Sequence, residues 1–425
     1  MAHDLLIENG TFVTVNPAFD VIENGILAMD GGCISRIEKR PPGAPLPEAR
    51  EHVDAGGALV LPGLVNTHTH LPMSLFRGLA DDLPLQQWLH DHIFPAEARF
   101  VTPDTVRTGT LLSCAELLLS GSTTCCDGYF FEDQVAEAVL SVGIRAVAGQ
   151  GVIDFPAPGV PDPSRNVNHA LDFAKKWRGV SPLISPSIFC HSPYTCSRET
   201  LVRAKQAAAD MDLIFQIHAA ETRSELEQIR AEHQATPIGY LDNLGIVDEK
   251  TLLVHTIWVD GDDIDIIAER KAPVSVTTES EMKLASGIAP IPAFLDAGIT
   301  VGLGTDSCAS NNDLDMFQEM DMTAKLHKVS LKDPTIGSLE VGKQADVIIL
   351  EGNQPHLIPL YSPASHLVYS ARGSDVRDVF VAGKALVRNR RLTSIDIEAV
   401  MAEAVAIGRN ISKKGDGKKR DVPNI

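Results

Sequence analysis

The sequence has no excess of basic residues and no long apolar segment. Lys and Arg number 37 against 56 Asp and Glu, and the formal net charge is −19. A protein that binds nucleic acid by neutralising phosphates needs the opposite balance, so we expect no nucleic acid partner. No run of about 18 apolar residues occurs, and the first residues carry Asp4 and Glu8 in place of a basic segment followed by an apolar one. We therefore expect no membrane partner and a cytoplasmic protein.

Several signatures of disulfide, metal and hydrolase chemistry are also absent. The seven cysteines include no Cys-x-x-Cys pair, and their odd number is typical of reduced, mostly buried thiols rather than of disulfides or a thiolate zinc site. The motifs His-Glu-x-x-His, Gly-x-Ser-x-Gly and Pro-Cys-x-x-Cys do not occur. Their absence excludes the common zinc proteases, serine esterases and cytidine-type deaminases.

The two ends of the chain share a pattern that differs from that of the middle. The 425 residues, 44% of them apolar and 22% charged, suffice for one large core or for two to three domains. Short segments with two-residue periodicity occupy residues 1–60 and return over 338–400, which predicts a small β-sandwich built from both ends. The segments expected as strands near the C-terminal end are 345–350, 366–369 and 376–381. The Lys-rich residues 411–425 predict a solvated, disordered tail.

Residues 61–337 alternate helical patterns with short, fully apolar runs, which are typical of buried parallel strands. The runs are 61–65, 123–126, 146–148, 183–189, 213–217, 252–254, 274–276 and 300–303. Thr102 and Pro103 predict the start of a helix that ends near Gly121. Further helices are expected over 133–142, 198–210, 223–233 and 314–327. Strands and helices in this order predict an α/β fold, a (β/α)8 TIM-type barrel.

Metal-binding side chains fall at the predicted carboxyl ends of these strands, where barrels of this kind carry their chemistry. They are His68, His70, His218, His255 and Asp306. In extended backbone His68 and His70 point the same way and can share one ion. Imidazoles with a carboxylate suit Zn²⁺ or a similar divalent ion. A single strand-end histidine is more often a hydrogen-bonded structural residue, but five such residues at one end favour a metal site.

Glu221 lies three residues after His218, close enough to such an ion to transfer protons without binding it. The alternative is a carboxylate that stabilises a helix N-terminus. The predicted fourth strand ends in Cys190-His191-Ser192-Pro193, without a lysine that could bridge two ions as a carbamate. We therefore expect one divalent metal ion per subunit, with zinc preferred.

Four segments together resemble the amidohydrolase superfamily, and within it the branch of 5-methylthioadenosine/S-adenosylhomocysteine deaminases, which is related to the triazine hydrolases. They are 62–70 (Pro-Gly-Leu-Val-Asn-Thr-His-Thr-His), 216–222 (Gln-Ile-His-Ala-Ala-Glu-Thr), 283–287 (Lys-Leu-Ala-Ser-Gly) and 302–317, which begins Gly-Leu-Gly-Thr-Asp. The resemblance covers most of the chain. It implies a metal ion on His68, His70, His218 and Asp306, a hydrogen bond between His255 and the attacking water, and Glu221 as the proton shuttle.

The deaminase branch also implies substrate contacts. Trp88 would line the pocket, Glu97 would bind ribose hydroxyls, and His191 would contact the purine ring. The simpler alternatives are a packing aromatic at Trp88, a surface carboxylate at Glu97 and a structural histidine at His191. Gln150 stands where some relatives have an arginine for the amino-acid carboxylate of S-adenosylhomocysteine, and Arg165 is the nearest substitute. This departure favours a neutral 5′ substituent, as in methylthioadenosine.

Two further departures from the family concern other segments. Residues 276–282 replace the family's usual His-Asn-Pro-x-Ser-Asn, which predicts an altered edge at the seventh strand. The chain also passes directly from Thr335 to Ile336, where relatives carry a further helical segment.

These residues predict an aminohydrolase that acts on C–N bonds of cyclic amidines. The expected reaction is deamination of an adenosine-type nucleoside (5-methylthioadenosine, S-adenosylhomocysteine or adenosine) to the inosine analogue and ammonia. Glu221, His255 and Asp306 would be its catalytic residues. The alternative is a guanine, 8-oxoguanine or s-triazine deaminase or chlorohydrolase; Glu97 discriminates, because a free base has no ribose. A silent metal-bound scaffold is disfavoured, since it needs no Glu221. We expect a homodimer or homotetramer.

Overall fold

The computed structural model describes residues 2–331 and 345–415, and its larger part is a parallel eight-stranded barrel. The barrel strands are β6 (Leu64–Thr69), β7 (Ser122–Tyr129), β8 (Arg145–Val152), β9 (Ile184–Cys190), β10 (Ile214–Ala219), β11 (Thr251–His255), β12 (Val274–Val276) and β13 (Val301–Leu303). Each pairs with the next along the chain, and a parallel bridge between Thr69 and Asp306 joins the last strand's end to the first. The predicted α/β barrel is confirmed.

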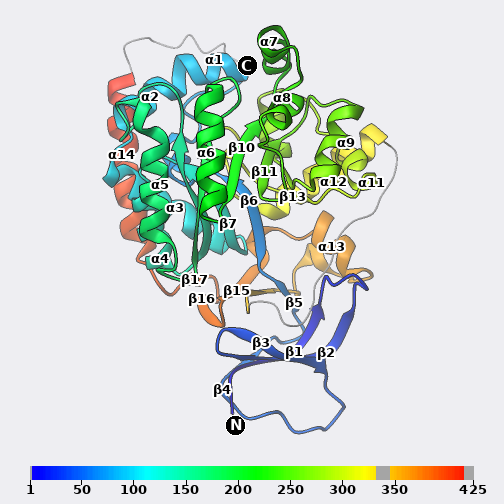
Figure 1. Cartoon of the computed structure of the whole chain (residues 1–425). Helices are drawn as coiled ribbons and strands as arrows, with labels where there is room; N and C mark the ends of the chain where they lie inside the picture. The colour runs from blue at the N-terminus through cyan, green and yellow to red at the C-terminus, as the bar shows by residue number, and fades with distance from the viewer. Residues whose placement is uncertain (1, 332–344, 416–425) are drawn as a thin grey trace, which may run out of the picture.

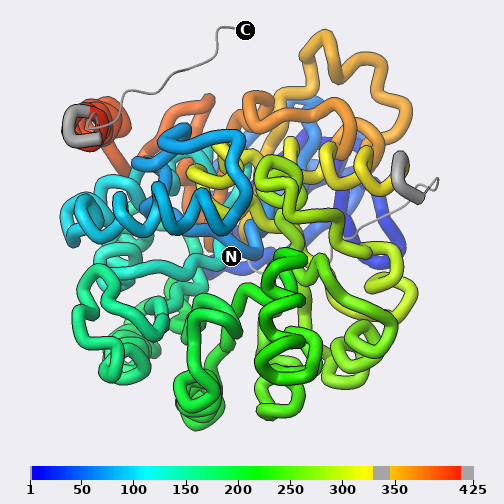
Figure 2. Tube along the Cα trace, turned by 90° about the horizontal axis from the view of Figure 1, so that it is seen from above, coloured from blue at the N-terminus to red at the C-terminus, as the bar shows by residue number. Residues whose placement is uncertain are grey.

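Helices surround this barrel, as the view from above in Figure 2 shows. They include α3 (Pro103–Leu119), α4 (Glu132–Val142), α5 (Asn166–Trp177), α6 (Arg198–Asp210), α7 (Arg223–His233), α8 (Pro237–Asn243), α9 (Gly261–Arg270), α11 (Ile291–Asp296) and α12 (Met316–Leu331). Helix α3 begins as its sequence predicts: the Thr102 side chain accepts from the backbone N–H of Thr105, and Pro103 occupies the first turn. The predicted helices at 133–142, 198–210, 223–233 and 314–327 are all present, with small shifts at the ends of α4 and α12.

The first predicted run, 61–65, belongs to two different sheets. Leu61 lies in β5 (Leu59–Pro62), outside the barrel, whereas Leu64 begins β6. Gly63 forms the junction, and a Cβ atom there would lie 2.1 Å from Oγ1 of Thr123. Only glycine lets the chain cross from one sheet to the other against β7, which explains why one apolar run contains a sheet boundary.

Strands from both chain ends form a second sheet, which we call the terminal sheet. Its strands are β1 (His3–Val13), β2 (Val21–Asp30), β3 (Cys33–Lys39), β4 (Ala49–Asp54), β5, β14 (Val347–Leu350), β15 (Val376–Val381), β16 (Lys384–Arg388) and β17 (Arg391–Leu392). Hydrogen bonds link them in one continuous sheet in which β5 lies between β1 and β14. Leu5 and Phe12 from one end pack with Val347 and Phe380 from the other, so neither end buries its apolar face alone. Figure 1 shows this sheet below the barrel, at the amino end of β6.

Two expectations near the C-terminal end are wrong. Residues 366–369 belong to helix α13 (Pro363–Tyr369), not to a strand, because Ser362 caps the helix by accepting from the N–H of Ser365 and proline follows it. The tail expected from residue 411 begins inside helix α14 (Ile397–Gly415), where Ile411 is buried; this helix lies against α3 (Figure 1). Residues 416–425 and the junction at Thr335 lie outside the described residues.

None of the helices in the described ranges is long and apolar enough to cross a membrane. The short elements that remain lie in loops: η1 (Leu71–Phe76), α1 (Leu85–Trp88), η2 (Leu89–Ile93) and α2 (Phe94–Phe100) between β6 and α3, η3 (Pro163–Arg165) before α5, α10 (Thr278–Lys283) after β12, and η4 (Pro355–Leu357) and η5 (Gly373–Asp375) near α13. The first four cover the carboxyl end of the barrel, where the cavity described below opens.

Candidate active site

The structure brings His68, His70, His218 and Asp306 together at the carboxyl ends of their strands. Nε2 of His68 lies 3.0 Å from Nε2 of His218. Oδ1 of Asp306 lies 3.5 Å from Nε2 of His68 and 3.3 Å from Nε2 of His70. Ligand atoms of His68, His70 and Asp306 therefore converge on one point, and so do those of His68, His218 and His255.

Neighbouring groups hold these side chains in their orientations. Nδ1 of His70 is 2.6 Å from the carbonyl oxygen of Gly128 and donates to it, which turns Nε2 toward Asp306. The other carboxylate oxygen of Asp306 accepts from the hydroxyls of Ser280 and Ser310, each at 2.7 Å. Asp306 thus presents Oδ1 to the histidines. The two serines are functional positions that we did not predict.

Electrostatics favour a neutral ring at His68 and His218 beside an ionised carboxylate. Although burial lowers the pKa of the other two histidines, Asp306 raises that of His70, and Glu221 raises that of His255 to about 9. Burial lowers the pKa of His68 to about 4 and holds the pKa of His218 well below its usual value. The pKa of Asp306 is lowered although burial alone would raise it, because His68 and His70 hydrogen-bond to the carboxylate. Metal ions bind deprotonated imidazoles and carboxylates.

The donor set fits a divalent metal ion. His68 is fully buried, and its Nδ1 has no hydrogen-bond partner. Its Nε2 faces three further nitrogen or oxygen donors within a few ångströms. Burying this many polar atoms without a compensating ligand would be costly.

Glu221 and His255 face each other beside the four converging side chains. Oε2 of Glu221 lies 3.7 Å from Nε2 of His255. Burial raises the pKa of Glu221 to about 7, and the charge of Asp306 adds to this effect. A carboxyl group with this pKa can both accept and release a proton near neutral pH.

The backbone beneath Glu221 is held in an unusual conformation. Ala220, His255 and Asp306 all have positive φ angles, of 56°, 70° and 57°, which L-residues rarely adopt. The carboxylate of Glu225 accepts the backbone N–H groups of Ala220 and Glu221 at 2.8 and 2.9 Å and fixes one of these turns. Such backbone strain is concentrated at functional sites. Glu225 is another residue that we did not predict.

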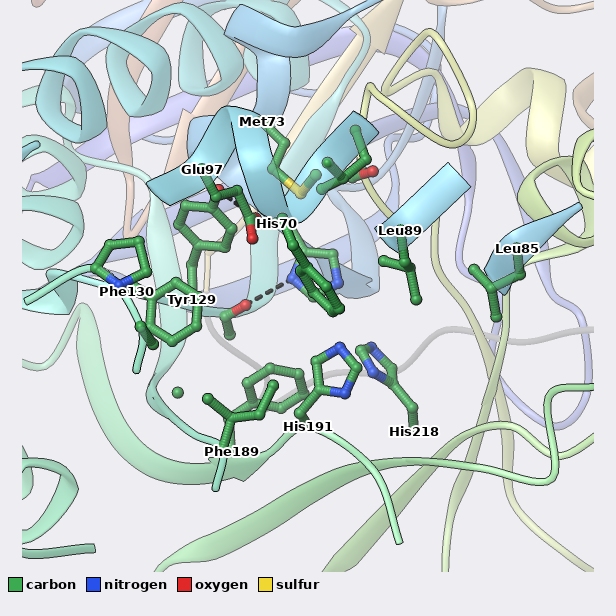
Figure 3. Close-up of a pocket in the computed structure, with 18 of the residues that line it drawn as sticks. His70, Met73, Leu85, Leu89, Glu97, Tyr129, Phe130, Phe189, His191 and His218 are labelled. Atoms are coloured by element: carbon green, nitrogen blue, oxygen red, sulfur yellow. Dashed lines mark hydrogen bonds between the residues drawn. The ribbon is translucent and has the colours of Figure 1, made fainter. Parts of the chain in front are cut away.

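A cavity of about 380 Å³ opens over these residues and contains three of the five predicted substrate contacts. Trp88, Glu97 and His191 line it, together with His70, His218, Glu221, His255 and Asp306. The hydroxyl of Tyr129 donates to Glu97 at 2.7 Å, and burial raises the pKa of Glu97 to about 7. In the view of Figure 3, Glu97 and His70 lie on one side of the cavity and His191 and His218 on the other.

The other two predicted contacts, Gln150 and Arg165, do not reach this cavity. Gln150 lies on β8 next to Gly149, at which a Cβ atom would point to Ser187 inside the barrel, so the Gln150 side chain faces the helices instead. There its Oε1 accepts the backbone N–H of Glu132. Arg165 is exposed in η3. Gln150 thus lies outside this cavity because successive residues of a strand point to opposite faces.

Apolar side chains that we did not predict form the rest of the cavity wall. They include Phe94, Phe130 and Phe155, together with residues 156–158. Phe94 contacts both Phe155 and His191, with ring centroids 5.3 and 6.1 Å apart. None of the Lys or Arg residues in the described ranges lines the cavity.

Comparison with known proteins places the chain in a family. Residues 59–336 match the amidohydrolase family. The chain is 41% identical to a 5-methylthioadenosine/S-adenosylhomocysteine deaminase of Syntrophobacter fumaroxidans, covering 96% of this chain and 98% of that one. It is 38% identical to a 5′-deoxyadenosine deaminase of Methanopyrus kandleri, covering 94% and 98%. A solved adenosine deaminase of Xanthomonas campestris with bound zinc superposes with a TM-score of 0.93 at 35% identity, covering 97% and 99%. The chain therefore belongs to the amidohydrolase family.

Proposed function

We propose that the protein is a metal-dependent aminohydrolase that deaminates adenosine-type nucleosides at C6 and releases the inosine analogue and ammonia. One observation carries this proposal: Glu221, a buried carboxyl with a pKa of about 7, lies beside the four converging metal-binding side chains. Both it and the buried carboxyl of Glu97 line the same cavity. The names of the three relatives reported above, which are nucleoside deaminases, support the same reaction.

We propose zinc as the divalent ion, held by His68, His70, His218 and Asp306. Imidazole and carboxylate ligands suit zinc, and the structurally similar adenosine deaminase was solved with zinc bound. When bound, such an ion lowers the pKa of water from about 15.7 toward about 7 and so supplies hydroxide at neutral pH.

The side chains of this chain then move the protons. Glu221 accepts one proton of the attacking water and delivers it to the ring nitrogen beside C6, so that negative charge does not build up on the purine. Asp306 accepts the second proton and passes it to the amino group, which leaves as ammonia when its bond to C6 breaks. His255, 3.7 Å from Glu221, orients the attacking water. The oxygen of water ends on C6 of the product.

The cavity favours a nucleoside whose 5′ substituent is neutral. We propose that Glu97 accepts hydrogen bonds from the ribose hydroxyls and that His191 contacts the purine, since both side chains line the cavity. The aromatic wall of Phe94, Phe130 and Phe155 suits a methylthio or methyl group, whereas no Lys or Arg of the described residues lines the cavity to pair with the carboxylate of S-adenosylhomocysteine. We therefore propose methylthioadenosine and 5′-deoxyadenosine as better substrates than S-adenosylhomocysteine.

An ultraviolet assay of deamination on protein of known metal content tests the proposal. The substrates are methylthioadenosine, 5′-deoxyadenosine, adenosine, S-adenosylhomocysteine, guanine and a chlorotriazine. We expect the highest kcat/KM for the first two and a lower value for S-adenosylhomocysteine. Turnover of guanine or the triazine alone would replace the proposal by the free-base alternative, in which Glu97 has no ribose to bind.

We further propose that the enzyme works in the cytoplasm as a homodimer or homotetramer. The seven cysteines are free, and all but Cys33 and Cys126 are buried, as expected of a protein kept reduced. Size-exclusion chromatography with light scattering measures the subunit number directly, and a monomer at assay concentration would contradict this part.

A further inference from the structure

A buried hydroxyl and a buried carboxylate lie behind His255, on the side of the ring turned away from Glu221. Nδ1 of His255 is 2.9 Å from Oγ1 of Thr277, and Oγ1 of Thr277 is 3.5 Å from Oε1 of Glu281. The same Oε1 lies 3.7 Å from Nδ1 of His255. His255 and Glu281 are each 2% exposed and Thr277 is 0% exposed. Water does not compete for these contacts.

The turn between β12 and α10 fixes this arrangement. Thr277 follows β12, which pairs with β11, the strand that ends at His255. Oε1 of Glu281 accepts the backbone N–H of Thr277 at 3.0 Å, and the N–H of Glu281 donates to the carbonyl of Thr277 at 3.0 Å. These two hydrogen bonds therefore hold Glu281 beside Thr277, the residue whose hydroxyl contacts His255.

The directions of these hydrogen bonds follow from the groups involved. Oε1 of Glu281 accepts the backbone N–H of Thr277 and so acts as an acceptor, and a threonine hydroxyl has one proton to donate. The Thr277 hydroxyl donates that proton to Glu281, so its oxygen must accept from Nδ1 of His255. Nδ1 therefore carries a proton, and Nε2, which faces Glu221 and the cavity, is the nitrogen that gains or loses one.

We propose that Thr277 and Glu281 are positioning residues that keep a proton on Nδ1 of His255 and leave its Nε2 to meet the attacking water. This inference rests on the proposed function, because it assigns to His255 a role in that reaction. Both residues lie in the segment 276–282.

Substitutions at the two positions separate the loss of an acceptor from a change of shape. In Glu281→Met no acceptor remains, so the Thr277 hydroxyl turns its proton to Nδ1 and the ring proton moves to Nε2. We expect kcat to fall about 10- to 100-fold, the usual effect of removing a partner behind a ligand, while KM and metal content stay unchanged. Glu281→Gln and Thr277→Ser keep an acceptor and a hydroxyl and should retain most activity, whereas Thr277→Val should resemble Glu281→Met.

Glu319→Met is the matched control. Glu319 is also a fully buried glutamate that holds this turn, because it accepts the N–H of Thr278 at 2.6 Å, and no contact joins it to His255 among the described residues. We expect a comparable loss of thermal stability without the loss of kcat. Equal losses of kcat in both variants would show a merely structural role and overturn the inference.

The ring proton itself can be observed in zinc-loaded protein labelled with 15N-histidine, by NMR under conditions in which the ring of His255 is neutral. The His255 signals are assigned by their loss in His255→Asn. We expect the proton on Nδ1 in the wild type and on Nε2 in Glu281→Met. A proton on Nε2 in an active wild type would overturn the inference alone. If the wild-type protein instead deaminates no nucleoside but carries the proton on Nδ1, the proposed function is contradicted. The assignment of the proton to Nδ1 then still holds.

Discussion

The two ends of the barrel bury different kinds of side chain. At the amino end, the terminal sheet covers a mainly apolar core that includes Phe12 and Phe380, and its buried Asp378 is paired with Arg377. At the carboxyl end, His68, Glu221 and Asp306 are buried with their charges or lone pairs facing one another. Burying apolar surface stabilises a fold, whereas burying ionisable groups costs free energy unless they are paired. One end therefore supplies stability that the other consumes.

The positions of the ligands on the chain make this division possible. His68, His218 and His255 occupy the last residues of their strands or lie next to them, so the strand interiors remain free for apolar packing. The terminal sheet joins β6 at Gly63, at the far end of the same strand. Substitutions at the carboxyl end should thus change activity and leave the stability supplied by the terminal sheet intact, and substitutions in the terminal sheet should do the reverse. Four experiments test that separation.

His218→Ala should have the largest effect. Nε2 of His218 lies 3.0 Å from that of His68, and its loss opens the donor set. We expect no bound metal by elemental analysis and no detectable deamination, with thermal stability in the absence of metal equal to or above that of the metal-free wild type. A variant that keeps its metal and its turnover would remove His218 from the ligands.

Glu221→Gln should lower kcat about 10²- to 10⁴-fold, the range that a positioned proton donor or acceptor contributes. The amide keeps the shape of the carboxyl but cannot carry the proton, so metal content and the binding of a product analogue should be unchanged. Steady-state kinetics with metal analysis measures both. Unchanged turnover would show that another group shuttles the proton.

Ile349→Ala is the converse experiment in the terminal sheet. Ile349 is fully buried in β14 among apolar neighbours. Truncation should lower the free energy of unfolding by about 2–5 kcal/mol, and Ile349→Val by about 0.5–1.5 kcal/mol. Denaturant titration gives these values, while kcat per folded molecule should remain that of the wild type. A parallel loss of kcat would show that the two ends are coupled.

The contrast also explains what could be predicted from the sequence. The barrel and the convergence of His68, His218 and Asp306 follow from one rule, that parallel strands align their carboxyl ends, and each residue lies one to three positions after an apolar run. The placement of Gln150 could not be judged from its distance along the chain, because a single step along β8 reverses the face.

Thr277 and Glu281 were missed because their contact with His255 depends on the turn after β12, which no periodic pattern encodes. Residues 366–369 were misassigned because the cap at Ser362 and Pro363 was given less weight than the apolar pattern.

Glu97→Gln offers the smallest and most specific test. Burial raises the pKa of Glu97 from 4.5 to about 7, so the folded protein binds a proton there more tightly than the unfolded chain does. Its contribution to stability is present below about pH 4.5 and is lost as the pH rises through about 7, at about 1.4 kcal/mol per unit of pKa difference. Glutamine carries no charge and can still accept from Tyr129. We therefore expect Glu97→Gln to raise the free energy of unfolding by up to about 3 kcal/mol near pH 8 and not at all near pH 4, while kcat/KM for nucleosides falls. Denaturant titrations at the two pH values check the first effect. Equal stability at both values would show that this carboxyl, although buried, costs the fold nothing.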